Sequence, residues 1–282
     1  MTYRSILTVV DGSRWAEHRA RVAAGLAARF GARLTGAFPR PAPPVSAWDQ
    51  PLDWGLTPSI PPALSPEAVA AHERRSDAQA EDARMAFEAA ADQAGCRSDW
   101  MTIPGASAAG VLQLMRRTDL SILPTGRLPT LGETGTTAAD LVLDSGGPAL
   151  LLPDRAAAPL PGRRVLVAWN GSREAARALR DAWPFLTIAE SVRVALVRSA
   201  EAEEPDSLLQ RYFEDHGREV ELVVVREPDA GVADALRAEA EALGADLIVM
   251  GLYGRSRLRE TILGGVSRSL LDSAGIPILA TH

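Results

Sequence analysis

The sequence contains a single cysteine, Cys96, among its 282 residues. One cysteine excludes an intrachain disulfide and any zinc site built from several cysteines. No apolar run approaches the length of a bilayer-spanning helix. The N-terminus "MTYRSILTVVDGS" lacks the cationic region, apolar stretch and cleavage site of a secretory signal. Together these absences predict a protein of the reducing cytoplasm.

Positive charge is also limited, because 30 Lys and Arg stand against 36 Asp and Glu, for a formal net charge of -6. This balance argues against a nucleic acid or an anionic membrane as the main partner, although a local basic cluster can still bind a small anion. Apolar residues make up 46% and charged residues 23%, as in a globular protein with a sizeable core. The length allows one large domain or two ordinary ones.

Motifs of common catalytic sites are absent. Neither G-x-x-x-x-G-K-[ST] nor a G-x-G-x-x-G after the first strand of either half occurs, which excludes a P-loop and the dinucleotide fingerprint. "GASAAG" misses the G-x-S-x-G nucleophile elbow, and Ser107 is interpreted as a helix-start residue. The histidines show no ligand spacing and are interpreted as exposed: His18, His72, His216 and His282. The sequence therefore gives no direct support for catalysis.

An internal repeat organises the whole chain. "ILTVVDGSRWAEHRA", from Ile6, aligns without a gap with "VLVAWNGSREAARAL", from Val165, and two later segments recur in the same order. We interpret this as a tandem duplication with halves at about 1–155 and 162–282. The Ala, Pro and Gly of Asp154–Gly162 are typical of a linker.

The second half alternates strand-like and helix-like segments. We predict strands at Arg164–Trp169, Val192–Val197, Val220–Val225, Leu247–Met250 and Ile276–Ala280, and helices at about Ser172–Leu186, Pro205–His216, Gly231–Leu243 and Gly264–Ser273. The strands are continuously apolar, as burial on both faces of a parallel sheet requires. The predicted fold is α/β, with two tandem doubly wound five-stranded parallel-sheet (Rossmann-like) domains.

The first half departs from this pattern in the Pro-rich segment from Phe38 to Glu67, which contains Trp48 and Trp54. So many prolines predict neither a continuous helix nor a central strand. Two interpretations stay open. The segment is either a surface excursion anchored by its aromatic residues, or a lid or partner-binding element.

A glycine-rich loop follows the fourth strand of the second half. Gly251 and Gly254 let backbone amides approach a bulky anion, and Gly264 and Gly265 open the last helix, whose free N–H groups favour phosphate. Arg255 adds positive charge in the loop, and Ser267 can add a hydroxyl from the first turn of the helix. The pattern indicates a phosphate cradle at the edge where a doubly wound sheet binds ligands.

These glycines resemble the signature of the universal stress protein family, which is G-x-x-G, nine residues, then G-[ST]. Gly251, Gly254 and Gly264 match that spacing, and Asp11-Gly12-Ser13 and Asn170-Gly171-Ser172 resemble the end of the family's first strand. The resemblance covers nearly the whole chain as a tandem pair and weakens only across the Pro-rich segment.

The resemblance implies membership of the ATP-binding subset of the family. It assigns Asn170 to the ribose, Val197 to the adenine and the glycine loop to the phosphates, so we expect ATP, ADP or AMP as the ligand, with or without Mg²⁺. Two departures stand out: Asn170 replaces an aspartate, and Gly265 replaces the usual Ser or Thr, for which Ser267 can substitute. A lost hydroxyl contact costs about 0.5–1.5 kcal/mol.

The first half lacks an equivalent cradle. Aligning Asp119 with Asp246 places Pro124 and Arg127 where the second half has glycines, and a proline removes an N–H donor. The downstream Gly135-Thr136 pair retains the G-[ST] element. We expect one competent site, in the second half.

The leading hypothesis is a cytoplasmic stress or regulatory protein that binds an adenine nucleotide, with slow hydrolysis at most. The resemblance implies an intrachain pseudo-dimer docked through Ala149–Leu152 and Ile278–Ala280; whether two chains pair further is left open. One rival is a scaffold that has lost nucleotide binding and engages a protein through its Pro-rich segment. An enzyme that uses the nucleotide as substrate is the weaker rival, since no general base or carboxylate pair accompanies the loop.

Overall fold

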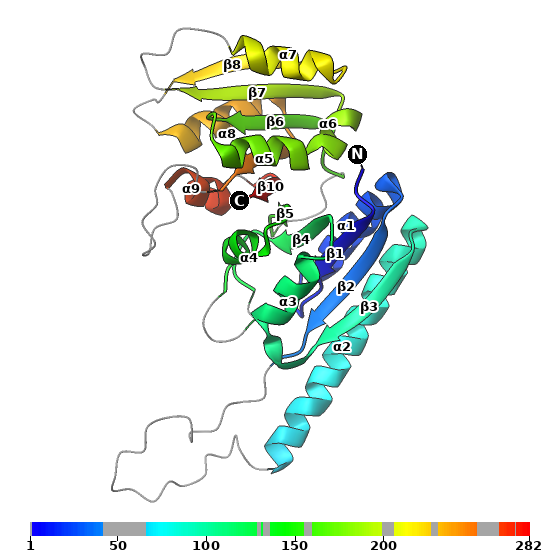
Figure 1. Cartoon of the computed structure of the whole chain (residues 1–282). Coiled ribbons are helices and arrows are strands. Elements are labelled where there is room, and N and C mark those ends of the chain that lie inside the picture. Colours follow the sequence, from blue (N-terminus) through cyan, green and yellow to red (C-terminus); the bar gives the residue numbers. More distant parts are fainter. Residues whose placement is uncertain are drawn as a thin grey trace, which may run out of the picture.

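A computed structural model describes residues 2–41, 66–128, 131, 136–154, 160–198, 206–226, 231–252, 265–273 and 275–282. Within these residues, ten strands form one continuous sheet in the order β3-β2-β1-β4-β5-β10-β9-β6-β7-β8. Figure 1 shows the two halves of the molecule meeting at β5 and β10. The duplicated sequence therefore builds a single sheet with one fold on either side of its centre.

The elements follow one another in regular alternation. The strands are β1 Ser5–Val9, β2 Arg33–Pro39, β3 Ser98–Ile103, β4 Leu120–Pro124, β5 Ala149–Leu152, β6 Arg164–Trp169, β7 Ser191–Arg198, β8 Glu221–Arg226, β9 Leu247–Gly251 and β10 Ile278–Thr281. The helices are α1 Ala16–Phe30, α2 Pro66–Ala94, the 3₁₀ turn η3 Pro104–Ala106, α3 Ala108–Met115, α4 Ala138–Ser145, α5 Arg173–Asp181, α6 Trp183–Ile188, α7 Ser207–Asp215, α8 Val232–Leu243 and α9 Gly265–Ser273.

The two halves have the same topology. Read outward from the centre, the first half runs β5-β4-β1-β2-β3 and the second runs β10-β9-β6-β7-β8, with parallel neighbours throughout each half. Among the ten described strands, only β5 and β10 pair antiparallel, with Ile278 opposite Leu151 and Ala280 opposite Ala149. The predicted fold class, two doubly wound halves packed as a pseudo-dimer through their last strands, is confirmed.

Helices cover both faces of the sheet, and each face carries one hydrophobic core that spans both halves. On one face α1, α2, α5, α6 and α7 contribute to the core, and on the other α3, α4, α8 and α9 do so. The central strands are buried on both sides, which explains why their sequences are continuously apolar.

Three aromatic rings join the two halves. Tyr3 and Phe30 of the first half meet Phe185 of α6, with centroid separations of 5.1 to 5.8 Å and edge-to-face geometry. The Tyr3 hydroxyl also donates a hydrogen bond of 2.5 Å to the carbonyl of Asp181. Edge-to-face pairs add stability beyond the burial of their area, so this cluster fixes one half against the other.

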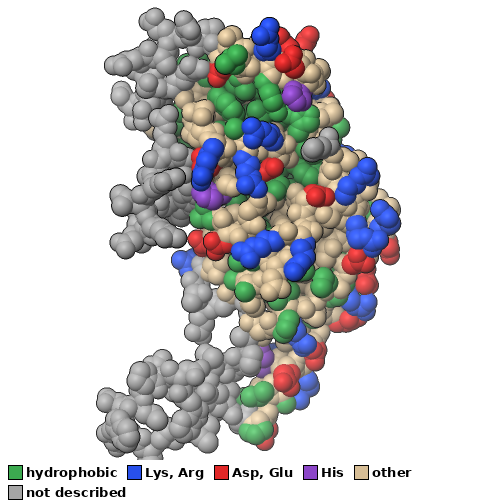
Figure 2. All heavy atoms as spheres, in the orientation of Figure 1, with side chains coloured by type: hydrophobic (Ala, Val, Ile, Leu, Met, Phe, Trp, Pro, Cys, Tyr) green, Lys and Arg blue, Asp and Glu red, His purple; other side chains and the backbone are tan. Residues whose placement is uncertain are grey.

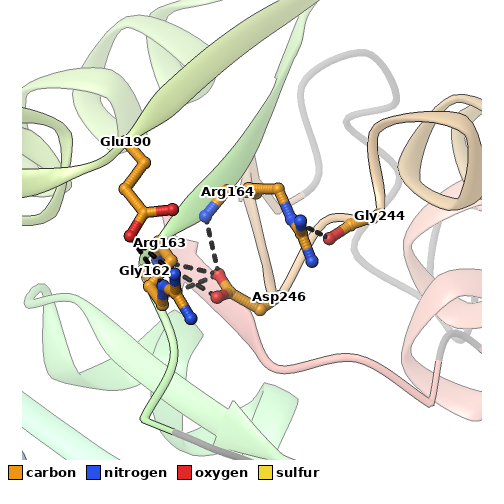
Figure 3. Close-up of polar contacts among 6 residues, drawn as sticks. All are labelled: Gly162, Arg163, Arg164, Glu190, Gly244 and Asp246. Atoms are coloured by element: carbon orange, nitrogen blue, oxygen red, sulfur yellow. Dashed lines mark hydrogen bonds and ion pairs between the residues drawn. The ribbon is translucent and has the colours of Figure 1, made fainter.

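An aspartate fastens the start of the first strand in each half. The Asp246 carboxylate accepts hydrogen bonds of 2.9 to 3.1 Å from the backbone amides of Gly162, Arg163 and Arg164, as Figure 3 shows. In the first half, Asp119 accepts from the amides of Arg4 and Ser5 at 2.8 and 2.9 Å. The two aspartates that align in the repeat thus bind the backbone at the start of the first strand of their half in the same way.

Two predicted segments differ from the structure. The helix expected over Ser172–Leu186 is divided at Ala182 into α5 and α6, because Pro184 in the first turn of α6 has no N–H to continue the hydrogen-bond ladder. The Pro-rich segment, predicted from Phe38 to Glu67, is shorter at both ends, since Phe38 belongs to β2 and Pro66 opens α2. Trp48 and Trp54 lie outside the described residues.

Charged side chains are intermingled on the surface. On the face drawn in Figure 2, basic and acidic side chains lie among one another. All 30 basic residues are arginine, because the sequence contains no lysine. None of the described helices combines the length and the apolarity that a membrane span requires.

Candidate nucleotide site at the carboxyl edge of the sheet

Three of the predicted site residues lie at one edge of the sheet. Strands β9, β6 and β7 are neighbours, and Asn170 directly follows the last residue of β6. The register pairs Trp169 with Leu196, so Asn170 lies beside Val197 of β7. The chain leaves β6 toward β7 and later returns on the other side at β9, so the winding reverses between β6 and β9. Parallel sheets of this kind bind ligands at such a switch point.

Asn170 organises the turn that starts α5. Its Oδ1 accepts a hydrogen bond of 3.0 Å from the amide of Ser172, and Gly171 between them has φ +73°. Ser172 then caps the helix, as predicted, by accepting from the amide of Ala175 at 3.2 Å. Asn170 is exposed to solvent, so its amide group stays accessible to a ligand at the edge of the sheet.

Gly251 has a packing role that the sequence pattern did not reveal. A Cβ at this position would lie 2.5 Å from the carbonyl carbon of Glu174 and 2.7 Å from the amide nitrogen of Ala175. The end of β9 therefore touches the backbone of the first turn of α5, and only glycine allows this approach. Gly251 is thus needed for the fold as well as being a candidate for anion binding.

A buried carboxylate lies at this contact. The Glu174 side chain is 7% exposed, and its Oε1 accepts a bond of 2.5 Å from Nε of Arg173. Burial acts to raise the pKa of Glu174, but the hydrogen bonds from Arg173 and from a backbone amide, with the charges of Arg173 and His282, outweigh it and hold the pKa below its ordinary value. Glu174 is therefore ionised at neutral pH. Sequence reasoning missed this pair, although Arg173 lies in the repeated Gly-Ser-Arg motif.

The remaining predicted residues lie beyond β9. Gly265 begins α9, and Ser267 is buried in its first turn, 6% exposed. Gly254, Arg255 and Gly264 lie outside the described residues. The structure thus brings Asn170, Val197 and Gly251 together, and it places Gly265 and Ser267 at the start of the helix that leads into β10.

The equivalent edge of the first half is filled by the chain itself. Asp11, in the position of Asn170, is 4% exposed, and Nη2 of Arg19 donates to its Oδ1 at 2.5 Å. The hydroxyl of Ser13 donates to the same oxygen at 2.5 Å, and the Arg19 guanidinium also lies 3.7 Å from Asp154. In the second half the residue aligned with Arg19 is Ala178, so α5 supplies no guanidinium at that position.

The described residues after β4 also bond to one another. Pro124 ends the strand and is buried, as is Leu128, whose amide donates to the carbonyl of Thr136 at 3.2 Å. Helix α4 begins with a capping box in which Thr137 accepts from the amide of Asp140 and Asp140 accepts from the amide of Thr137. Because a capping side chain and an acidic residue already occupy this helix start, it offers a poor place for phosphate.

Histidines and acidic residues form no metal centre in the part of the chain that the structure describes. The interpretation of four exposed histidines is wrong for three of them, since only His216 is exposed while His18, His72 and His282 are half-buried. Burial lowers the pKa of His18, and the neighbouring Arg21 and Arg19 lower it further. The Ser107 interpretation is confirmed, because its hydroxyl accepts from the amide of Gly110 at the start of α3.

Comparison with known proteins agrees with this architecture. Residues 162–282 match the model of the universal stress protein family, whereas no match was found among curated proteins. A universal stress protein from Archaeoglobus fulgidus DSM 4304 has the same fold over 98% of this chain and 97% of its own, with a TM-score of 0.72 and 16% identity. A protein from Pseudomonas aeruginosa UCBPP-PA14 assigned to the universal stress proteins matches over 99% and 93%, with a TM-score of 0.55 and 17% identity.

A universal stress protein solved in complex with cAMP also matches, over 54% of this chain and 97% of its own, with 18% identity. Its TM-score of 0.32 is too low to transfer its ligand to this chain. The full-length matches, by contrast, cover both halves of the sheet, as a tandem arrangement requires. Residues 162–282 therefore belong to the universal stress protein family, and the chain as a whole has the fold of a tandem, two-domain universal stress protein.

Proposed function

We propose that the second half binds an adenine nucleotide, ATP foremost, at the carboxyl edge of β9, β6 and β7, and that the protein has a regulatory or stress-protective role in the cytoplasm. One observation carries the proposal: the two halves share a fold but differ at this edge. Asp11 is buried in an ion pair with Arg19, whereas Asn170 is exposed to solvent beside the end of β9.

The residues at the open edge suit a nucleotide. The Asn170 side chain offers an amide that can bond a ribose hydroxyl, and the end of β7 at Val197 can flank the base. The start of α9 at Gly265 supplies backbone N–H groups and a positive dipole end for phosphate. Mg²⁺ would enter as part of the ligand, coordinated by the phosphates. We expect hydrolysis to be slow at most.

The proposal is tested by identifying a bound ligand and by measuring stabilisation. We expect mild denaturation of the purified protein to release an adenine nucleotide that mass spectrometry detects. ATP, ADP or AMP at 100 times its dissociation constant should add about 2.7 kcal/mol to the free energy of unfolding. A chain that carries no nucleotide and is stabilised by none of the three would contradict the proposal.

A matched pair of variants tests the assignment to one half. Gly254→Val should abolish the stabilisation by nucleotide, because it adds a branched side chain to the proposed cradle. Gly126→Val in the first half should leave it unchanged: a Cβ there meets nothing within 4 Å, and its backbone is not left-handed. If both variants respond alike to nucleotide, the assignment of a single site to the second half is wrong.

A second candidate is a scaffold that engages a protein through the Pro-rich segment. It is favoured by α2, whose N-terminal turns extend past the sheet in Figure 1 and bear exposed residues such as Glu73 and Arg74. Removing residues 42–65 should then abolish capture of that partner and leave stabilisation by nucleotide intact. The reverse result would assign the segment to the nucleotide site.

A further inference from the structure

The chain has no lysine, so any permanently charged side-chain cation that binds a phosphate in it must be an arginine. Arginine suits this task because its planar fork can donate two hydrogen bonds to one phosphate. We infer that Arg173 is a phosphate-binding residue of the site and that Glu174 is the residue that positions it. The inference rests on the proposed nucleotide site and names a contact that the family signature does not include.

Arg173 stands at the switch point of the second half. It is the first residue of α5, directly after the cap Ser172, and its side chain is 76% exposed. Its Nε donates to Glu174, and no other polar contact of Arg173 is found among the described residues. The two Nη groups are therefore available to a ligand.

Glu174 connects this arginine to the end of β9. The carboxylate is buried and ionised, and the backbone of Glu174 packs against Gly251 closely enough to exclude any Cβ there. A buried anion bonded to Nε restricts the arginine to few rotamers, so less entropy is lost when the guanidinium binds a ligand. Glu174 thus restrains Arg173 in the first turn of α5, the turn that the end of β9 contacts.

The first half provides an internal comparison. The repeat aligns Arg14 with Arg173 and Trp15 with Glu174. Without a carboxylate beside it, the Arg14 guanidinium lies over the Trp15 ring, 4.8 Å from its centroid, and the neighbouring Asp11 is sealed by Arg19. The same Gly-Ser-Arg motif therefore carries a guanidinium stacked on an aromatic ring in one half and a guanidinium bonded to a carboxylate in the other.

The test measures the affinity of the full-length protein for adenosine, AMP, ADP and ATP by calorimetry in the presence of EDTA. Arg173→Gln should weaken ATP binding about tenfold, or ~1.4 kcal/mol, with a smaller loss for AMP and no loss for adenosine. Arg173→Lys should retain part of the ATP affinity, because it keeps the charge but loses the fork. Arg14→Gln is the matched control and should change none of the four affinities.

The role of Glu174 is tested by a double-mutant cycle, because Glu174→Gln also removes a negative charge that repels phosphate. In the Arg173→Gln background the substitution reports that repulsion alone. In the wild-type background Glu174→Gln should change the ATP affinity less favourably than it does in the Arg173→Gln background, because the arginine is then no longer held by a carboxylate. Independent effects of the two substitutions would overturn the positioning role.

The outcomes separate this inference from the proposed function. If ATP binds the wild type and Arg173→Gln behaves as Arg14→Gln does, the arginine contact is wrong and the nucleotide site stands. If adenosine binding falls together with ATP binding, Arg173 supports the fold of the site rather than a phosphate. If neither adenosine nor any of the three nucleotides binds the wild type, the proposed function itself fails.

Discussion

The Arg19 guanidinium lies 2.5 Å from the Asp11 carboxylate, and the two side chains are only 2% and 3% exposed. This pair occupies the position that the second half leaves open at Asn170. An ion pair removed from water stabilises the fold only when both partners are present, because either charge left alone keeps its full desolvation cost. The two halves thus differ at this edge, with a buried ion pair in the first and an exposed asparagine in the second.

Removing one partner of this pair should destabilise the protein strongly. We expect Arg19→Met to lower the free energy of unfolding by about 3–5 kcal/mol, because it leaves the Asp11 carboxylate buried without its positive partner. Urea denaturation measures the change. The double variant Asp11→Asn with Arg19→Met should lose less than the sum of the two single losses, and strict additivity would show that the pair is not coupled.

Gly251→Ala should destabilise the fold independently of any ligand. The new Cβ would lie 2.5 Å from the Glu174 backbone, so β9 and α5 must separate, at a cost of about 1–3 kcal/mol. Gly126→Ala is the control, since a Cβ there meets no atom within 4 Å. Thermal unfolding without nucleotide should show a lower midpoint for the first variant only; equal midpoints would mean that the contact can relax.

Tyr3 should make stability decline at alkaline pH. Burial raises the pKa of Tyr3 well above its ordinary value, and the charges of Asp181 and Asp119 raise it further. The unfolded chain releases this proton near pH 10 while the folded protein holds it, so the stabilisation is present below pH 10 and is lost as the pH rises above it. Tyr3→Phe should show a shallower decline in urea titrations between pH 9.5 and 11, and an unchanged slope would contradict this origin.

Asp246→Asn should destabilise the second half. The amide can present its NH₂ group to backbone donors that now bond a carboxylate at 2.9 to 3.1 Å, and losing a hydrogen bond of this kind costs about 0.5–1.5 kcal/mol. Asp119→Asn should cost less, because Asp119 accepts from two backbone amides and is exposed. Denaturation of both variants measures the difference; a larger loss at Asp119 would show that this bonding does not set the stability.

The sequence predicted the architecture because its signals are local and repeated. Strand β6 was predicted at its observed bounds, and the pairing of the last strands was expected from the family resemblance. A continuous apolar run indicates a buried strand, and each of the capping serines Ser107 and Ser172 bonds the amide three residues later. Both signals are local in the sequence, so the pattern alone predicts them. The division of the helix at Ala182 was missed, although Pro184 was a visible signal for it. The boundaries at 155 and 162 remain predictions.

The site was only partly predictable. The sequence by itself determined that polar and glycine residues follow buried strands, which places Asn170, Val197 and Gly251 at one edge of a parallel sheet. Only the tertiary structure decided that Arg19 reaches Asp11, that Gly251 touches α5 and that Glu174 accepts a hydrogen bond from Arg173. These contacts depend on burial and on distances between side chains of different elements, and a linear pattern of residues contains neither quantity.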